Sequence, residues 1–285
     1  MYISEYPVGA GPDRRAAPES GSRHPEYLDC GVLGPLRIGT GATPGTITVP
    51  PKIRSVLAML LVHTDQVVPV SALMRELWQE HPPASGLRTL QTYVLNCRKL
   101  LVGLTGLPAP VITQDVLVTR AGGYGLNGAH VRLDWLRFQR LAEHGARVLA
   151  TGDDLGGIDL LEEALGLWHG AALADVPAGP VIDSKRRLFE ESQLGVIGSL
   201  AEARIRAGLH QEAITQLAAA TSEHALHEGL HAHYIRALAL GGRRAEALGV
   251  FQALRARLVS EIGIEPGYPL QQLQLTVLNS GPLAM

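Results

Sequence analysis

The segment 86–102 carries side chains of the kinds that read the edges of nucleic-acid bases, at the spacing of an α-helix. Arginine and lysine donate hydrogen bonds to guanine or phosphate, asparagine and glutamine bond adenine, and threonine or leucine meets a thymine methyl. A helix that is merely solvated would also carry charges and amides. Projected at about 100° per residue, one face holds Arg88, Thr92, Leu95, Asn96 and Lys99, with Gln91 and Arg98 on a flank.

The opposite face of the same segment is apolar. A stripe of this kind predicts that the helix packs on a core and leaves its polar face free, so that the polar face is able to enter the major groove of DNA. The apolar residues fall within about 40° of one another and are Leu90, Val94, Cys97 and Leu101.

Two shorter helices are predicted ahead of this segment, over 51–63 and 71–79. Pro51 suits the first turn of the earlier helix, where its missing N–H costs nothing. Ser71 and Ser85 are candidate N-caps for the second and third helices, because serine is favoured where a helix begins. The three helices together form the expected frame for the polar face.

Short β-rich runs lie on both sides of the three helices. We expect a strand region at 28–38 and a second strand at 47–49, and further β-rich runs at 111–113 and 116–119. The order of strands, three helices and a final hairpin predicts a winged helix-turn-helix domain with an additional N-terminal sheet.

Arg120 lies beside a glycine turn in the expected hairpin, the wing. From there it could reach a phosphate or the minor groove; the alternative is one solvated arginine on a hairpin. We expect Gly123 to supply a positive φ and Tyr124 to pack inward.

Beyond Asn127 the pattern is helical to the end of the chain. Several segments pair as helix, short turn, helix, which is typical of helical hairpin repeats. The fold class is therefore mainly α, a winged-helix domain with small sheets followed by an all-α, tetratricopeptide-like domain. The expected helices span 133–150, 154–168, 182–207, 210–224, 227–240, 243–262 and 267–279.

Composition and hydrophobic periodicity divide the chain into three expected parts: a disordered arm at 1–26, the winged-helix domain at 27–128 and the helical domain at 129–285. Residues 28–127 carry eight Lys/Arg against five Asp/Glu, a net charge of +3, whereas residues 128–285 carry fourteen against eighteen, a net charge of −4. A mildly basic front and an acidic back suit a DNA reader joined to a protein-binding module.

Composition excludes several classes of protein. Hydrophobic residues make up 46% of the chain and charged residues 18%, so a disordered chain is not expected. Two cysteines, Cys30 and Cys97, are too few for a disulfide framework and suit a reducing cytoplasm. No apolar run approaches the length of a membrane span, and the first residues do not resemble a secretion signal. We expect a cytoplasmic, nucleoid-associated protein.

Motifs for catalysis or cofactor binding are missing from the sequence. There is no phosphate-binding loop, nucleophile elbow, zinc-protease helix or Cys-x-x-Cys pair, so neither an enzyme nor a cofactor is predicted. One histidine group has the spacing of a metal site if its helix is continuous, but it lacks a nearby thiolate or well-placed carboxylate, and no metal is predicted. Its members are His224, His227, His231 and His233.

Several motifs resemble the Streptomyces antibiotic regulatory protein family, in the family's order and over about residues 28–279, nearly the whole chain. The segments 73–83 and 88–101 look like its DNA-binding domain, and the wing 119–124 agrees. The later motifs resemble its bacterial transcriptional activation domain; they lie at 133–138, 226–231, 242–248 and 261–267.

This resemblance implies an OmpR-type winged helix, which binds direct repeats in the promoters of antibiotic or other secondary-metabolite gene clusters. It implies double-stranded DNA and RNA polymerase, including its sigma factor, as partners, with two copies on DNA and polymerase contact through 79–86. The dipeptide Asn96-Cys97 departs from the family pattern, which has a polar or basic residue followed by leucine. The preferred base and the packing of this helix could therefore differ from those of relatives.

Two other functions remain open from the residues alone. One is a ligand-controlled regulator with a small molecule between its helices, where Trp135, Trp168 and Tyr234 could line a pocket unless they are simply core. The other is an interaction adaptor that has lost DNA binding. Salt-dependent affinity for DNA would distinguish the leading prediction from the adaptor.

Overall fold

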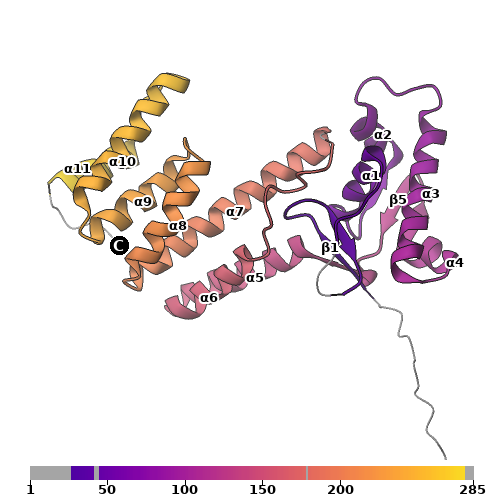
Figure 1. Cartoon of the computed structure of the whole chain (residues 1–285), viewed down its shortest axis with the longest axis horizontal. Coiled ribbons are helices and arrows are strands. Elements are labelled where there is room, and N and C mark those ends of the chain that lie inside the picture. The colour runs from indigo at the N-terminus through magenta and orange to yellow at the C-terminus, as the bar shows by residue number, and fades with distance from the viewer. Residues whose placement is uncertain (1–26, 42–44, 178, 280–285) are drawn as a thin grey trace, which may run out of the picture.

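The computed structural model describes residues 27–41, 45–177 and 179–279 (Figure 1). The predicted arm at 1–26 lies outside them. The fold is mainly helical with small sheets near the N-terminus, which confirms the predicted fold class.

The first sheet joins the first described strand to the strand that directly precedes α5 (Asp134–Ala150). Its order is β2-β1-β6: β1 (Leu28–Gly31) pairs antiparallel with β2 (Arg37–Gly39) and parallel with β6 (Val131–Leu133). The strand predicted at 47–49 does not form, and only an isolated bridge joins Thr46 to Arg37. The carbonyls of Ile47 and Val49 in this segment instead accept hydrogen bonds from Arg54.

Three helices follow, α1 (Pro51–Leu61), α2 (Val70–Trp78) and α3 (Gly86–Thr105). Pro51 begins α1 as predicted. Helix α2 starts one residue earlier than expected, so Pro69 is its N-cap residue instead of Ser71. Helix α3 continues three residues beyond the predicted end at 102 and stops at Gly106, whose left-handed conformation is typical of a helix C-terminus.

The chain between α3 and the wing is helical, whereas a β-rich run was predicted at 111–113. Helix α4 (Ala109–Val111) continues into one turn, η1 (Ile112–Val116). Ile112 and Val116 are both buried and lie four residues apart, which puts them on one side of a helical turn. The β-branched residues that indicated a strand therefore serve as the inner face of this turn.

The wing belongs to a second sheet with the order β3-β5-β4, formed by β3 (Val67–Pro69), β5 (Gly123–Leu126) and β4 (Leu117–Arg120). Gly122 has the positive φ of the turn, +77°. Gly123 is needed for a different reason from the predicted one, because a Cβ there would lie 2.2 Å from the carbonyl oxygen of Val68 on the neighbouring strand.

The rest of the chain forms antiparallel helices that cover the first sheet and continue away from it (Figure 1). The predicted helical segments are found with shifts of a few residues at their ends. They are α5 (Asp134–Ala150), α6 (Asp154–Leu165), α7 (Pro180–Arg206), α8 (His210–Glu223), α9 (Glu228–Leu240), α10 (Arg244–Arg257) with its added turn η3 (Leu258–Ile262), and α11 (Tyr268–Leu278).

Buried hydrophobic residues form two clusters. The first begins at Leu28 in β1, includes the three helices of the winged-helix domain, and continues through α5 and α6 to Ala203 in α7. The second begins at Leu194 in α7 and ends at Val277 in α11. Helix α7 therefore contributes to both cores, and the winged-helix domain shares its core with the first helices of the helical domain.

Candidate nucleic-acid interface

Helix α3 has one buried and one open face, as its sequence predicts. The buried residues Leu90, Val94, Cys97 and Leu101 are between 0% and 2% exposed. Cys97 lies against α1, with its thiol 4.0 Å from the carbonyl oxygen of Ile53. Burial raises the pKa of this thiol to about 12, so Cys97 is a neutral packing residue. On the same helix, Tyr93 stacks on Trp78 of α2.

The open face of α3 carries most of the side chains that were expected to contact DNA. Arg88, Gln91, Thr92 and Lys99 are exposed, and Asn96 is partly exposed. The hydroxyl of Thr92 donates to the carbonyl of Arg88 one turn earlier. All 20 residues of α3 lack a carboxylate, whereas Arg88, Arg98 and Lys99 are cationic.

Arg98, which is partly exposed, differs from its neighbours because its guanidinium is hydrogen-bonded to another element of the fold. Nε and Nη2 donate to the carbonyl oxygen of Leu117 at 3.0 and 2.9 Å, and Nη2 also donates to Thr119 Oγ1 at 2.9 Å. Both partners belong to β4. The residue that was expected to contact the DNA backbone thus joins α3 to the wing, which sequence spacing could not reveal.

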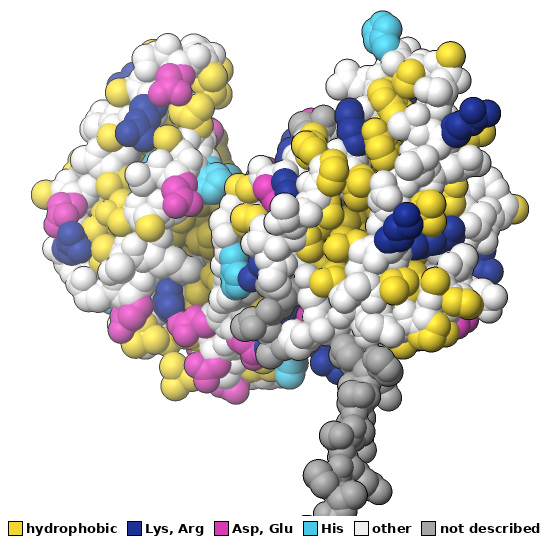
Figure 2. All heavy atoms as spheres, turned by 45° about the vertical axis from the view of Figure 1, so that its right-hand side comes forward, with side chains coloured by type: hydrophobic (Ala, Val, Ile, Leu, Met, Phe, Trp, Pro, Cys, Tyr) yellow, Lys and Arg dark blue, Asp and Glu magenta, His cyan; other side chains and the backbone are white. Residues whose placement is uncertain are grey.

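The wing presents Arg120 at the end of β4, exposed and directly opposite Gly123 of β5. Its position depends on the Gly122 turn and on the link from Arg98 to the same strand. Figure 2 shows Lys and Arg side chains over the winged-helix lobe, where few acidic side chains are visible, and more acidic side chains on the helical lobe. The surface charge of this lobe agrees with a polyanionic partner.

A set of buried polar contacts fixes the winged-helix domain against the helical domain. The Asp134 carboxylate at the start of α5 accepts hydrogen bonds from Val32 N–H at 2.9 Å and Leu33 N–H at 3.2 Å. Arg37 lies 3.9 Å from the same carboxylate. Burial raises the pKa of Asp134, and the backbone amides oppose this rise.

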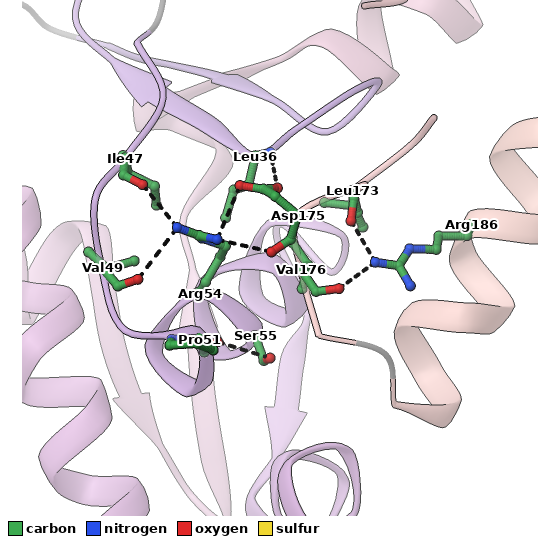
Figure 3. A network of polar contacts seen from close by, with 10 residues as sticks. All are labelled: Leu36, Ile47, Val49, Pro51, Arg54, Ser55, Leu173, Asp175, Val176 and Arg186. Carbon is green, nitrogen blue, oxygen red and sulfur yellow. Dashed lines mark hydrogen bonds and ion pairs between the residues drawn. The ribbon is translucent and has the colours of Figure 1, made fainter. Parts of the chain in front are cut away.

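A second contact centres on Arg54 of α1 and Asp175 in the segment between α6 and α7 (Figure 3). The Arg54 guanidinium donates to the Asp175 carbonyl at 3.0 Å and lies 3.4 Å from its carboxylate. It also donates to the carbonyls of Ile47 and Val49, in the segment where a strand was predicted. Asp175 in turn accepts a hydrogen bond from Leu36 N–H at 2.7 Å.

Glu76 of α2 makes the third contact, at the first turn of α7. Its carboxylate accepts hydrogen bonds from Val181 N–H at 2.8 Å and Ile182 N–H at 3.3 Å. The residue is only 5% exposed, and burial raises its pKa while the two amides oppose the rise. A carboxylate from the winged-helix domain thus supplies acceptors to otherwise unpaired N–H groups of α7.

The aromatic residues considered for a ligand pocket are part of the packing. Trp135 stacks with Phe138 and lies tilted against Phe189, and Trp168 meets Phe138 edge to face. Tyr234 packs against the other core cluster, so the three do not share one pocket. A cavity of about 660 Å³ between α5, α7 and α9 is lined by other residues, including Glu202, His227 and His233.

The histidine group does not form a metal site. Helix α8 ends at Glu223 and α9 begins at Glu228, so the helix is not continuous through His224 and His227. His227 Nδ1 accepts a hydrogen bond from Leu230 N–H as the N-cap of α9, and His231 is buried. Across the described part of the chain, no group of three or more His, Cys, Asp and Glu residues could hold a metal ion. Nor does any described helix combine the length and apolarity needed to cross a membrane.

Comparison with known proteins relates this chain to a family of bacterial regulators. Residues 133–278 match the model of the bacterial transcriptional activator domain. The chain is 40% identical over 259 residues to the regulatory protein DnrI of Streptomyces peucetius, covering 90% of this chain and 93% of DnrI. It is 34% identical to the regulatory protein AfsR of Streptomyces griseus, covering 87% of this chain but 24% of AfsR.

A solved structure shares the whole arrangement. Mycobacterium tuberculosis EmbR, in complex with a low-affinity phosphopeptide, superposes with a TM-score of 0.80 at 32% identity, covering 90% of this chain and 66% of EmbR. A curated EmbR sequence from that species carries the name transcriptional regulatory protein and is 33% identical over 259 residues. The motifs, the domain match and these relatives agree: the chain is a transcriptional regulator and belongs to the Streptomyces antibiotic regulatory protein family.

Proposed function

We propose that this regulator is a sequence-specific activator that binds direct repeats in promoters of a secondary-metabolite gene cluster, such as an antibiotic cluster, and recruits RNA polymerase. Helix α3 enters the major groove, where Arg88, Gln91, Thr92, Asn96 and Lys99 face bases or nearby phosphates. Arg120 reaches the backbone or minor groove from the wing.

The open face of α3 is the observation that carries the proposal. A solvated helix usually mixes cations with carboxylates, because i to i+4 pairs of opposite charge stabilise it. Here a 20-residue helix has cations and amides on its open side and no acidic residue at all. A surface of this kind attracts a polyanion and provides the donors that base edges accept.

Two further partners are part of the proposal, by analogy with related regulators. Two copies occupy neighbouring repeats in a head-to-tail pair, with the helical domain supporting their contact. The loop 79–86 between α2 and α3 contacts RNA polymerase, including its sigma factor. This loop is adjacent to the helix that reads DNA, and it includes His81, Pro82 and Pro83, all exposed.

A salt-titrated mobility shift tests the proposal. The full chain is titrated onto upstream DNA of its neighbouring genes, in the presence of scrambled competitor, at several salt concentrations. We expect competitor-resistant binding whose logarithm falls linearly with the logarithm of salt concentration. Weak binding without sequence preference would overturn the DNA-reading role and favour an interaction adaptor.

A further inference from the structure

One apolar side chain lies within the polar face of α3. Leu95 is 49% exposed. Large hydrophobic residues are otherwise well covered in this part of the molecule: across residues 28–41 and 45–133, only Val67, Leu87 and Leu95 are exposed. Two of these three belong to α3, the helix whose open side we assign to DNA.

Leu95 is located among the polar residues, not at the margin where the helix meets the core. At about 100° per residue it falls within about 60° of Arg88, Thr92 and Lys99. Its neighbours one turn away on either side, Gln91 and Lys99, are both exposed. The apolar stripe from Leu90 to Leu101 packs on the opposite side, so the core does not take up this side chain.

A leucine pressed against base edges needs an apolar group to meet. In the major groove, each base pair presents mainly hydrogen-bonding groups, and the thymine C5-methyl is the largest apolar group on its edge. Covering polar edges with a leucine that cannot pair with them would leave donors or acceptors desolvated and unmatched. A leucine held against the base edges at this position would therefore select for thymine.

We propose that Leu95 reads a thymine methyl and that the preferred half-site has thymine at the position facing the middle of α3. The inference rests on the proposed function, because it assumes that α3 lies in the major groove. It adds a specificity determinant that acts through shape and apolar contact, next to the hydrogen-bonding residues Gln91 and Asn96.

Deoxyuridine substitution tests this contact, because deoxyuridine lacks only the C5-methyl and keeps the other base-edge groups of thymine. A preferred duplex is first selected from random DNA with the full wild-type chain. Each thymine of that duplex is then replaced singly, and affinities are measured for wild type, Leu95→Ala and Leu275→Ala. Leu275 is a matched control, since it is 47% exposed on α11, a helix outside the winged-helix domain.

We expect one position in each half-site at which deoxyuridine weakens wild-type binding about fourfold, the effect of one buried methyl. Leu275→Ala should keep this sensitivity, whereas Leu95→Ala should bind the thymine and deoxyuridine duplexes equally. Specific binding without any deoxyuridine effect, or sensitivity retained by Leu95→Ala, would overturn the contact while leaving the proposed function intact. Failure of the wild type to select any sequence would overturn both. Circular dichroism confirms that the variants are folded.

Discussion

The winged-helix domain has two functional surfaces that treat polar groups in opposite ways. Where it meets the helical domain, Asp134, Asp175 and Glu76 accept hydrogen bonds from backbone amides. On the open side of α3, donors such as Lys99 point to solvent. The difference shows that polar side chains fix geometry where their partners are internal, whereas those on the open side of α3 remain accessible to an external partner.

Removing a carboxylate from the internal surface should have the largest effect. Asp134→Ala leaves the Val32 and Leu33 amides without their acceptor in a largely buried site, so we expect a loss of about 3 kcal/mol in the free energy of unfolding. Urea denaturation measures it. Asp153→Ala is the control, because Asp153 caps α6 from an exposed position; we expect a loss of about 1 kcal/mol there. Equal losses in the two variants would contradict the distinction.

Glu76→Ala should come next, with a loss of about 2 kcal/mol, because two amides of α7 lose their acceptors. Its pH dependence sharpens the test. Since burial raises the pKa of folded Glu76, the unfolded chain releases this proton first. The stabilisation of the folded state by the protonated form is therefore lost as pH rises above about 4.3 through the folded pKa.

The isosteric variant Glu76→Gln cannot titrate and isolates this effect. The wild-type free energy of unfolding, minus that of Glu76→Gln, should fall with rising pH across that window. Asp134 also has a raised pKa, but it is present in both proteins and cancels in the difference. A difference that is constant between pH 4 and pH 8 would show that Glu76 titrates normally.

The adjacent residues Arg98 and Lys99 represent the two kinds of polar group on one helix. Arg98 is hydrogen-bonded within the protein, whereas Lys99 is exposed to solvent. Arg98→Ala frees β4 from α3, and we expect a loss of about 1 kcal/mol in stability and weaker DNA binding with an unchanged salt slope.

Lys99→Ala should lower the slope by about 0.9, since one phosphate contact is lost. Mobility shifts over a salt series measure both, with Arg147→Ala on exposed α5 surface as the charge control. A smaller slope for Arg98→Ala would indicate a phosphate contact after all.

Asn96→Ala should have the smallest effect on overall affinity and a selective effect on sequence. An amide that reads a base contributes discrimination of about 1 kcal/mol at one position. Selection from random DNA should therefore give a site that differs from the wild-type site at that position only. Equal losses on every sequence would refute a base-reading role for Asn96.

The elements that follow from local pattern could be predicted from the sequence, including α3 with its buried stripe and most of the later helices. Predictions failed where tertiary contacts decide the outcome. The β-branched residues at 111–113 form a helical turn because Ile112 has a core to face. The carbonyls at 47–49 bond Arg54 instead of a neighbouring strand.

In the candidate site, too, local features could be predicted from the sequence, whereas long-range contacts could not. The exposed residues of α3 follow from helical spacing, whereas the internal role of Arg98 depends on β4, about twenty residues further along the chain. The contacts of Asp134 and Glu76 join residues more than 100 positions apart. The periodicity of a short sequence window does not reveal partners so far apart. The need for glycine at 123 likewise becomes clear only from the neighbouring strand, whose carbonyl leaves no room for a Cβ.

Helix α7 ties the direction of the second core to that of the winged-helix domain. It is 27 residues long, or about 40 Å, and one end is held by Glu76 of α2 while the other is packed in the second core. For an activator that works as we propose, the helical domain then points to a fixed side of the double helix. Moving the operator by half a turn, about five base pairs, would turn that domain away from the promoter, whereas a full turn would restore its direction.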